Sequence, residues 1–391
     1  MHVFDYSFEL ENYMTRERFE KIREFASTKQ TPFLVTSLGV IDRKYDELKK
    51  AMPYAKVYYA IKANPEEKVL RLLLDKGSCF DIASVYELDL MLKLGATPDR
   101  LSYGNTIKKS RDIKYAYEKG LRLFASDSES DVRKLAENAP GSSVFFRILA
   151  NGVGADWPLS RKFGAQPDVI FENVLLAKRL GLNPRGISFH VGSQQHDVTQ
   201  WRIALNTCRE LFDALRQHGI RLDLINMGGG FPAHYVHPVE ETYVYAAEIT
   251  DYMREFFGDE FPQVIVEPGR YMAGDAGVLV SEVVMISNKE RESGIPWLYI
   301  DAGKFGGLIE TMDECIRYPV YSERVGEAND YVLAGPTCDS MDVLYEKTPC
   351  RLPSNLQEGD RLYLFTAGAY TQTYSAVFFN GFPPLRSYVI E

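Results

Sequence analysis

The sequence predicts two domains, an α/β domain that folds as a (β/α)8 barrel of the TIM type and an all-β domain of the β-sandwich or β-barrel kind. Three observations lead to this prediction. Short β-rich runs alternate with longer helical patterns between about residues 56 and 267. These runs are almost continuously apolar, as parallel strands buried on both faces are. After about Tyr271 the long helical patterns stop, whereas the β-rich runs continue.

The alternating region contains eight β-rich runs. Eight successive β–α units suggest a sheet that closes into a barrel. The runs are Lys56–Lys62, Cys79–Ser84, Leu101–Asn105, Leu121–Ser126, Ser143–Leu149, Gly186–Val191, Leu222–Met227 and Val264–Glu267.

Helical patterns fill the segments between these runs. Their apolar residues recur at three- and four-residue intervals, which is the period of an amphipathic helix. Several patterns end in glycine, the residue that most often follows the last turn of a helix. Examples are Glu66–Lys76, Val85–Leu94, Asp112–Lys119 and Trp201–Gln217, and the closing glycines are Gly77, Gly95, Gly120, Gly181 and Gly219.

The all-β domain is expected from the C-terminal third of the chain together with the N-terminal segment. Phe33–Ser37 has the composition of a strand, precedes the eight runs and fits this second domain better than the barrel. We therefore expect residues 38–276 to form the barrel and residues 1–37 and 277–391 to form the β domain. The expected strands of the C-terminal third are Gly274–Ile286, Trp297–Ile300, Asp330–Leu333, Asp360–Phe365 and Ser387–Ile390.

The composition is that of a globular protein and argues against several classes of partner. The chain has 391 residues, of which 45% are hydrophobic and 25% charged. A net charge of −9 without a basic run argues against nucleic acid. No apolar stretch is long enough to span a membrane and the N-terminus lacks the parts of a secretion signal, so we expect a cytoplasmic location. The five cysteines are widely spaced without a CxxC pair, so neither a disulfide framework nor a metal site is expected.

Two glycine-containing turns predict a phosphate site. Gly228–Gly230 follow the seventh expected strand, and the tetrad Glu267-Pro-Gly-Arg270 begins at the end of the eighth. Successive glycines let backbone N–H groups crowd round an anion. In (β/α)8 barrels the loops after the seventh and eighth strands often bind phosphate. We therefore expect the chain to hold a phosphorylated cofactor.

Polar residues close several expected strands, where barrel enzymes carry their active sites. Lys62 closes the first strand, where desolvation would lower its pKa and make its amine nucleophilic; a lysine that simply reaches solvent is the alternative. Glu267 closes the eighth strand and could keep a pyridinium nitrogen protonated, or form a salt bridge with Arg270 or Arg147. His190, near the end of the sixth strand, could lie against a cofactor ring or be a hydrogen-bonded core histidine.

Three further residues extend this pattern. Asp81 lies near the end of the second strand and Arg147 near the end of the fifth, and each could be part of an ordinary ion pair. Ser193 could donate a hydrogen bond to phosphate or cap the next helix. Because polar residues are costly at such apolar positions, their joint occurrence at one end of successive strands indicates a functional site.

The motifs that carry these residues resemble those of the pyridoxal-phosphate decarboxylases of the alanine-racemase-like fold, and most closely those of bacterial-type ornithine decarboxylases. The resemblance covers nearly the whole chain, and both the order of the motifs and the distances between them fit. The motifs are Tyr59-Ala-Ile-Lys-Ala-Asn64, Phe80-Asp-Ile-Ala-Ser84, Arg161-Lys-Phe-Gly164, His190-Val-Gly-Ser193, Gly228-Gly-Gly-Phe231, Glu267-Pro-Gly-Arg270, Gly335-Pro-Thr-Cys-Asp-Ser340, Gly368-Ala-Tyr-Thr371 and Phe379-Asn-Gly-Phe382.

The resemblance implies a set of roles around pyridoxal 5'-phosphate. Lys62 would form the imine with the cofactor, Glu267 would face the pyridine nitrogen, and His190 would stack on the ring. Ser193, the three glycines, Gly269, Arg270 and Tyr370 would cradle the phosphate. The complete implied cofactor set is Lys62, Asp81, Arg147, His190, Ser193, Gly228, Gly229, Gly230, Glu267, Gly269, Arg270 and Tyr370.

The resemblance also implies a homodimer with shared active sites. Cys338 and Asp339 would reach into the partner's site, where Cys338 returns a proton to the carbanion and Asp339 binds the distal ammonium of the substrate. Lys162 and Asp342 match positions that pair across the family's dimer interface. The implied reaction converts L-ornithine to putrescine and CO2, a step of polyamine biosynthesis in which the cofactor ring takes up the electron pair.

Substrate choice depends on how far the distal ammonium lies from its carboxylates. In the eukaryotic ornithine enzymes an aspartate stands in a short helical turn that corresponds to Gly306–Cys315 here. An ungapped alignment puts Glu314 opposite that aspartate, and Asp313 is one residue earlier. Because one methylene is worth only about 1–3 kcal/mol, ornithine is favoured, lysine is a possible second substrate and arginine fits less well.

Other interpretations fit fewer of these residues. A diaminopimelate decarboxylase usually carries Cys-Glu-Ser where this chain has Cys338-Asp-Ser340. A regulator-like homologue without catalysis tends to lose the lysine or the cysteine, but this chain has both. An alanine racemase needs a tyrosine base whose typical motifs are absent. A barrel that binds phosphate without pyridoxal chemistry leaves Lys62, His190 and Glu267 unexplained.

Overall fold

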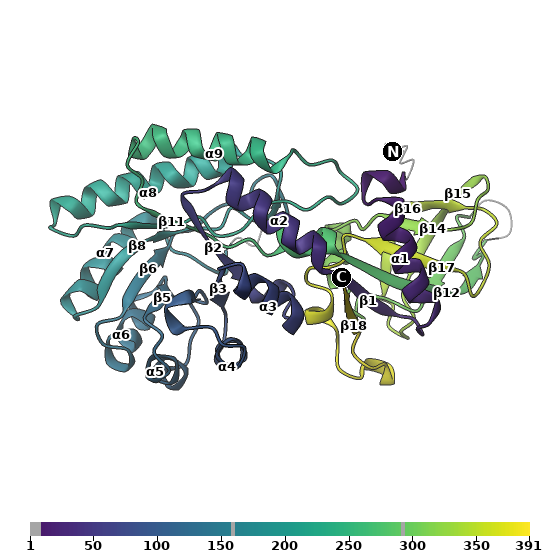
Figure 1. Cartoon of the computed structure of the whole chain (residues 1–391), viewed down its shortest axis with the longest axis horizontal. Coiled ribbons are helices and arrows are strands. Elements are labelled where there is room, and N and C mark those ends of the chain that lie inside the picture. The colour runs from purple at the N-terminus through teal and green to yellow at the C-terminus, as the bar shows by residue number, and fades with distance from the viewer. Residues whose placement is uncertain (1–8, 158–160, 291–293) are drawn as a thin grey trace. The chain divides into compact units, whose positions relative to one another are not determined.

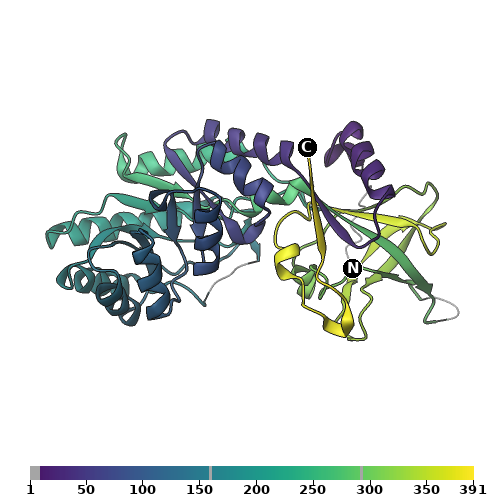
Figure 2. The same ribbon diagram turned by 60° about the horizontal axis from the view of Figure 1, so that its bottom comes forward.

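A computed structural model describes residues 9–157, 161–290 and 294–391. These residues form two compact units (Figures 1 and 2). We call the first, Asp42–Pro232 with Glu240–Tyr271, the barrel unit. The second, which we call the β unit, consists of the described residues up to Ile41, Ala233–Val239 and Met272–Glu391.

The barrel unit contains a closed barrel of eight parallel strands, and each predicted run supplies one of them. Around the barrel the strand order is β10-β11-β2-β3-β4-β5-β6-β8. The predicted (β/α)8 barrel is therefore confirmed. The strands are β2 (Ala55–Ala60), β3 (Cys79–Ile82), β4 (Leu101–Tyr103), β5 (Leu123–Ser126), β6 (Ser143–Arg147), β8 (Asn183–Ser188), β10 (Leu224–Asn226) and β11 (Gln263–Val266).

The helices that follow these strands lie outside the barrel (Figure 1). Each buries an apolar face; in α8 the buried residues include Trp201, Leu205 and Leu215. Five helices end at the predicted glycines, whose φ angles of 74–97° belong to the left-handed region. The helices after barrel strands are α3 (Glu67–Asp75), α4 (Val85–Lys93), α5 (Ser110–Glu118), α6 (Glu129–Asn138), α7 (Pro167–Arg179), α8 (Thr199–Gln217), α9 (Thr242–Phe257) and the short α10 (Arg270–Ala273), and α2 (Leu38–Ala51) precedes β2.

Apolar side chains fill the barrel interior. One buried cluster joins Tyr58, Ala125, Phe145, Leu224 and Ile265. Their strands lie on different sides of the closed sheet, so the cluster spans the interior as a packed layer. The barrel is therefore a solid scaffold that leaves the loops at the strand ends to carry function.

The β unit contains an eight-stranded sheet. Along it the order is β14-β17-β12-β13-β15-β16, and β1 pairs with both β12 and β18. The predicted run Phe33–Ser37 is β1, and both of its pairing partners are strands of this sheet. The other strands are β12 (Gly277–Ser287), β13 (Trp297–Ile300), β14 (Val320–Ser322), β15 (Ala328–Ala334), β16 (Val343–Pro353), β17 (Arg361–Phe365) and β18 (Arg386–Ile390).

The β unit differs from the expected all-β domain in two respects. Helix α1 (Arg16–Ser27) buries Phe19, Ile22 and Ala26 against strand side chains, so the unit is mostly β. Strands β14 and β16 were not predicted. Strand β16 contains Pro349, which disfavours a strand in sequence analysis, but it is an edge strand and pairs only with β15.

Several short elements complete the two units. A two-stranded sheet of β7 (Ala155–Trp157) and β9 (Ser193–Gln195) joins the loops after β6 and β8. The segment 233–239 lies between barrel strands in sequence but packs in the β unit, where the rings of His234 and Tyr13 stack at 4.8 Å. The 3₁₀ helices are η1 (Leu10–Asn12), η2 (Ile61–Ala63), η3 (Pro98–Arg100), η4 (Gly274–Ala276), η5 (Ile309–Glu314), η6 (Gln372–Tyr374) and η7 (Phe379–Gly381).

Candidate active site

The predicted barrel residues lie at the C-terminal end of the parallel strands or just beyond it. Asp81 is in β3 and Arg147 is the last residue of β6. The other three follow their strands: Lys62 is in η2 after β2, His190 lies two residues beyond β8, and Glu267 directly follows β11. Because all strands of a parallel barrel point the same way, these residues share one end of the barrel.

The glycine-rich turn after β10 is packed so closely that side chains do not fit. A Cβ atom on Gly228 would lie 2.4 Å from the carbonyl oxygen of Phe189, and one on Gly230 would lie 2.6 Å from Cγ2 of Val191. Gly228 and Gly230 also have φ angles of 63° and 102°. A Cβ on Gly229 would lie 2.9 Å from a backbone oxygen. The turn therefore requires glycine, and its exposed backbone suits an anion.

Asn226, the last residue of β10, fixes this turn and Glu267 together. Its Nδ2 donates to Glu267 Oε1 at 2.5 Å, and its Oδ1 accepts from the backbone N–H of Gly228 at 2.9 Å. The backbone N–H of Glu267 in turn donates to the Gly228 carbonyl at 2.7 Å. Our sequence analysis missed Asn226; an amide in an otherwise apolar strand was the available signal.

Arg270 and Ser193 lie together at the candidate phosphate site. Both side chains are buried, and Arg270 Nε donates to Ser193 Oγ at 2.9 Å. Ser193 is the first residue of β9, whereas Arg270 begins α10 after the eighth barrel strand. The two predicted residues are therefore brought together from separate loops.

His190 is neutral. Burial lowers its pKa well below the ordinary value, and the positive charges of Arg147, Lys62 and Arg270 lower it further. Its Nδ1 accepts a hydrogen bond from the backbone N–H of Gly192 at 3.1 Å, so the remaining ring proton is on Nε2. A neutral imidazole can pack against an aromatic ring without bringing another charge into the site.

Lys62 is exposed in this structure, so the desolvation expected for its amine is not seen, and two carboxyl groups lie within electrostatic reach of it. Burial raises the pKa of Asp81 well above its usual range, Glu267 raises it further, and Lys62 opposes the shift. Burial also raises the pKa of Glu87, whereas the Ala83 N–H and the charge of Lys62 lower it. Our sequence analysis missed Glu87, although Ser84-x-x-Glu87 has the pattern of a helix capping box.

Arg147 lies within electrostatic reach of the same carboxylates. Burial lowers its pKa, and Glu267, Asp127 and Asp81 oppose the change. Its guanidinium carbon lies 5.1 Å from the ring centre of Phe163. The barrel end thus brings cationic side chains and carboxyl groups within electrostatic reach of one another.

The predicted residues Cys338 and Asp339 lie in the β unit, in the turn between β15 and β16. The Cys338 residue is exposed, and its backbone N–H donates to Asn380 Oδ1 at 2.8 Å. Asp339 Oδ1 accepts from the backbone N–H of Met341 at 2.8 Å. The turn is therefore defined by hydrogen bonds while it leaves the cysteine accessible.

Asp342 organises this turn from within. It is 2% exposed, and its carboxylate accepts from the backbone N–H of Lys304 (2.7 Å) and from the backbone N–H (3.1 Å) and Oγ1 (2.7 Å) of Thr337. The resemblance pairs Asp342 with Lys162 across a dimer. In this structure the carboxylate is occupied inside its own unit, so such a pair would have to replace or share these bonds.

Three more predicted residues lie in the β unit. Tyr370 has a φ of 58°, and its ring lies 5.7 Å from that of Tyr374. Asp313 is exposed, and its side chain forms no hydrogen bond or ion pair with another residue in the described part of the chain. Glu314, in contrast, accepts three backbone hydrogen bonds from β16.

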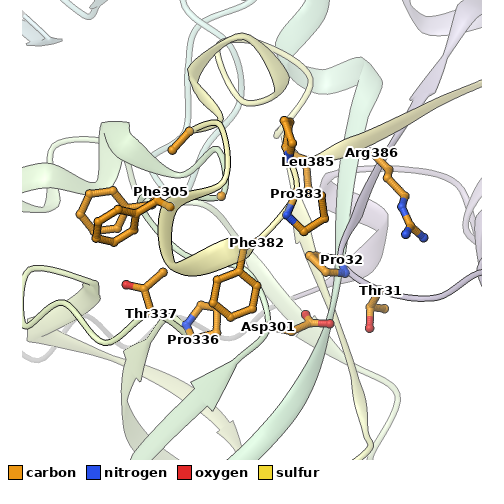
Figure 3. A pocket seen from close by; sticks show the side chains of 14 residues that line it. Thr31, Pro32, Asp301, Phe305, Pro336, Thr337, Phe382, Pro383, Leu385 and Arg386 are labelled. Atoms are coloured by element: carbon orange, nitrogen blue, oxygen red, sulfur yellow. The ribbon is translucent and has the colours of Figure 1, made fainter.

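The β unit also holds an apolar pocket of about 270 Å³ (Figure 3). Phe305, Phe379 and Phe382 line it, and the rings of Phe305 and Phe379 lie 4.4 Å apart. Pro336 and Thr337, from the turn that carries Cys338, line it as well. The pocket therefore adjoins the segment that bears the candidate proton donor.

Among residues 9–157, 161–290 and 294–391, no cluster of three His, Cys, Asp or Glu is placed to hold a metal ion. Over the same residues, no helix is both long enough and apolar enough to cross a bilayer.

The barrel residues fit pyridoxal phosphate. A glycine turn that admits no Cβ, beside buried Arg270 and Ser193, suits the phosphate. Glu267, held by Asn226, supplies a fixed carboxylate for a ring nitrogen, and neutral His190 suits the ring itself.

Comparison with known proteins gives the same cofactor. The family model for "Pyridoxal-dependent decarboxylase, pyridoxal binding domain" matches residues 38–274. A lysine/ornithine decarboxylase from Selenomonas ruminantium is 33% identical, over 95% of this chain and 92% of that protein. A Vibrio vulnificus lysine/ornithine decarboxylase, solved with putrescine, superposes with a TM-score of 0.85 at 30% identity, over 96% of this chain and 99% of that one. Antizyme inhibitor 2 from Xenopus laevis is also 30% identical, over 97% of this chain and 85% of that protein.

Proposed function

This chain belongs to the pyridoxal-dependent decarboxylases, and we propose that it converts L-ornithine to putrescine and CO2, with L-lysine as a slower second substrate. The observation that carries the proposal is the joint presence of a barrel end that fits the cofactor and two aspartates, Asp313 and Asp339, near the surface of the β unit. Carboxylates at those positions suit a substrate with a distal ammonium group.

In the proposed mechanism each barrel residue has one task. Lys62 would supply the amine that holds the cofactor covalently. Glu267, fixed by Asn226, holds a proton on the pyridine nitrogen. Arg270, Ser193 and the glycine turn bind the phosphate. When bound, pyridoxal phosphate supplies an electron sink for the electron pair left behind by CO2.

The β unit is proposed to complete the reaction. The thiol of Cys338 returns a proton to the α-carbon, and Asp339 binds the distal ammonium group. We propose that both act in the site of a second copy of the chain, in a homodimer. Exposed apolar side chains near this turn support that proposal, since large exposed apolar surface is typical of interfaces. They include Met341 (56% exposed), Val377 (71%), Phe378 (66%) and Phe382 (44%).

The choice between ornithine and lysine is expected to be one of degree. The two substrates differ by one methylene, which changes binding by only about 1–3 kcal/mol. The names of the relatives from Selenomonas ruminantium and Vibrio vulnificus include both lysine and ornithine, which supports a dual preference. The larger guanidinium of arginine is expected to fit less well.

The test is diamine production by the purified, cofactor-loaded protein, given L-ornithine, L-lysine, L-arginine and meso-diaminopimelate in parallel. Putrescine as the main product is the expected result, and cadaverine at a comparable rate would make the protein a dual ornithine/lysine enzyme. No product from any substrate, with cofactor bound covalently, would contradict it. That outcome would favour a non-catalytic role. The similarity to a protein named antizyme inhibitor 2 makes such a role the alternative.

A further inference from the structure

Glu314 aligns with the substrate-binding aspartate of the eukaryotic enzymes, but its carboxylate is committed to the backbone of its own unit. Oε1 accepts from the N–H groups of Glu346 (2.8 Å) and Lys347 (2.6 Å), and Oε2 accepts from that of Thr348 (3.1 Å). Arg317 lies 3.6 Å away, and the Glu314 side chain is 11% exposed. A carboxylate with both oxygens in charge-assisted bonds has little capacity left for an ammonium ion.

The three amide groups need this carboxylate because β16 is irregular where they lie. Its pairing with β15 is interrupted between Leu333↔Tyr345 and Tyr331↔Cys350, so residues 346–349 oppose a single residue of β15. Such a bulge leaves its extra residues without ladder partners. Unpaired N–H groups are costly when they are removed from water, so Glu314 supplies the missing acceptor.

The segment that carries Glu314 also needs to be held. Asp313 and Glu314 have φ angles of 53° and 61°, so two successive residues other than glycine are left-handed. The left-handed region is unfavourable for residues other than glycine, and such strain persists only where the surroundings fix it. The hydroxyl of Tyr345, in β16, adds a second tie by donating to the Ile316 carbonyl at 3.0 Å.

We propose that Glu314 is a positioning residue that ties residues 310–316 to the β16 bulge, so that Asp313 presents its carboxylate to the substrate's distal ammonium. The substrate half of this inference rests on the proposed function. Asp313 is suited to the task because it is exposed and makes no side-chain bond within the described part of the chain. The substrate would then meet an aspartate at position 313 rather than a glutamate at position 314.

Amide hydrogen exchange tests the tie itself. Glu314→Gln keeps the shape of the side chain but replaces one acceptor oxygen by an NH2 group, which cannot accept from an amide. In the cofactor-loaded protein we expect exchange at residues 346–348 to accelerate about tenfold. Glu346→Gln is the matched control, because its exposed carboxylate has no partner among the described residues. Unchanged exchange in Glu314→Gln would overturn the inference.

Steady-state kinetics with L-ornithine test how Glu314 acts. Asp313→Asn and Glu314→Gln should each raise KM about tenfold while kcat changes less than about twofold, as for a contact made equally in ground and transition states. In the double variant the effects should not multiply, because Glu314 acts through Asp313. A KM increase of about a hundredfold in the double variant, the product of the two, would overturn the inference and make Glu314 a direct ligand.

The two measurements separate this inference from the proposed function. If the wild-type protein decarboxylates no basic amino acid, the proposed function fails and the role of Asp313 fails with it. The exchange experiment would still decide whether Glu314 holds the bulge. If ornithine is a substrate but Asp313→Asn leaves KM unchanged, only the assignment of Asp313 is overturned.

Discussion

The two units position their candidate site residues in different ways. In the barrel unit the fold itself does so: Lys62, His190 and Glu267 follow parallel strands whose ends meet. In the β unit the corresponding residues lie on turns and irregular segments, and the carboxylates of Asp342 and Glu314 hold the backbone there. A barrel site is thus carried by repeated β–α units, whereas the β-unit site depends on single buried acids.

The largest expected effect is that of Lys62→Ala, which removes the one amine that the barrel is proposed to offer the cofactor. We expect no measurable decarboxylation. We also expect that borohydride no longer fixes the cofactor to the chain, as read by mass spectrometry. Lys56→Ala, at an exposed position of the same strand, is the control and should keep activity. Full activity in Lys62→Ala would contradict the assignment.

A second experiment tests whether Lys62 of one chain and Cys338 of another act in the same active site. Inactive Lys62→Ala and inactive Cys338→Ala chains are mixed and allowed to exchange subunits. If sites are shared, half of the dimers are hybrids and each has one intact site, so about one quarter of wild-type activity should return. Activity is measured alongside hybrid formation by native mass spectrometry. Hybrids without activity would show that each chain uses its own Cys338.

The next effect concerns stability in the β unit. Asp342→Asn keeps one acceptor oxygen but places an NH2 group against donors of Lys304 or Thr337. We expect the free energy of unfolding to fall by about 2 kcal/mol, measured by urea denaturation. Asp259→Asn is the control, since Asp259 is exposed and makes no side-chain bond in the described part of the chain. Equal stability of the two variants would mean that the turn does not depend on the buried acid.

The smallest expected effect is a gain in stability in the barrel unit. Because the pKa of Asp81 is raised in the folded state, the folded protein binds more protons than the unfolded chain. The free energy of unfolding therefore falls as pH rises from the unfolded pKa, about 3.9, through the folded value. Asp81→Asn should remove this fall and stabilise the cofactor-free protein at neutral pH by about 1 kcal/mol or more. Urea unfolding between pH 5 and 8 measures it, and an unchanged pH slope would contradict it.

Sequence patterns predicted the barrel more completely than the β unit for a physical reason. Each barrel strand is a short apolar run, and such a run can be recognised in the sequence without knowledge of the strands that pair with it. Strand β16 contains Pro349 and several polar residues, and its pairing depends on β15. Asn226 and Glu87 were also missed. Each acts through hydrogen bonds to residues that come close to it only after folding.

The two candidate substrate-binding residues of the β unit show the same limit of prediction from sequence. The sequence offered Asp313 and Glu314 as equivalent acids one residue apart. Only folding gives Glu314 its three amide partners and leaves Asp313 without any in the described part of the chain. Two neighbouring carboxylates of similar chemistry can therefore have different tasks, and their identity alone does not distinguish them.

The bulge in β16 has a consequence for assembly between molecules. An edge strand offers a row of free amides to which a strand of another chain can add, which is a route to aggregation. In β16 the amides of residues 346–348 already donate to Glu314, and Pro349 has no amide. Four successive residues of this edge therefore cannot serve as a template for a foreign strand. The carboxylate that shapes the sheet also limits its growth.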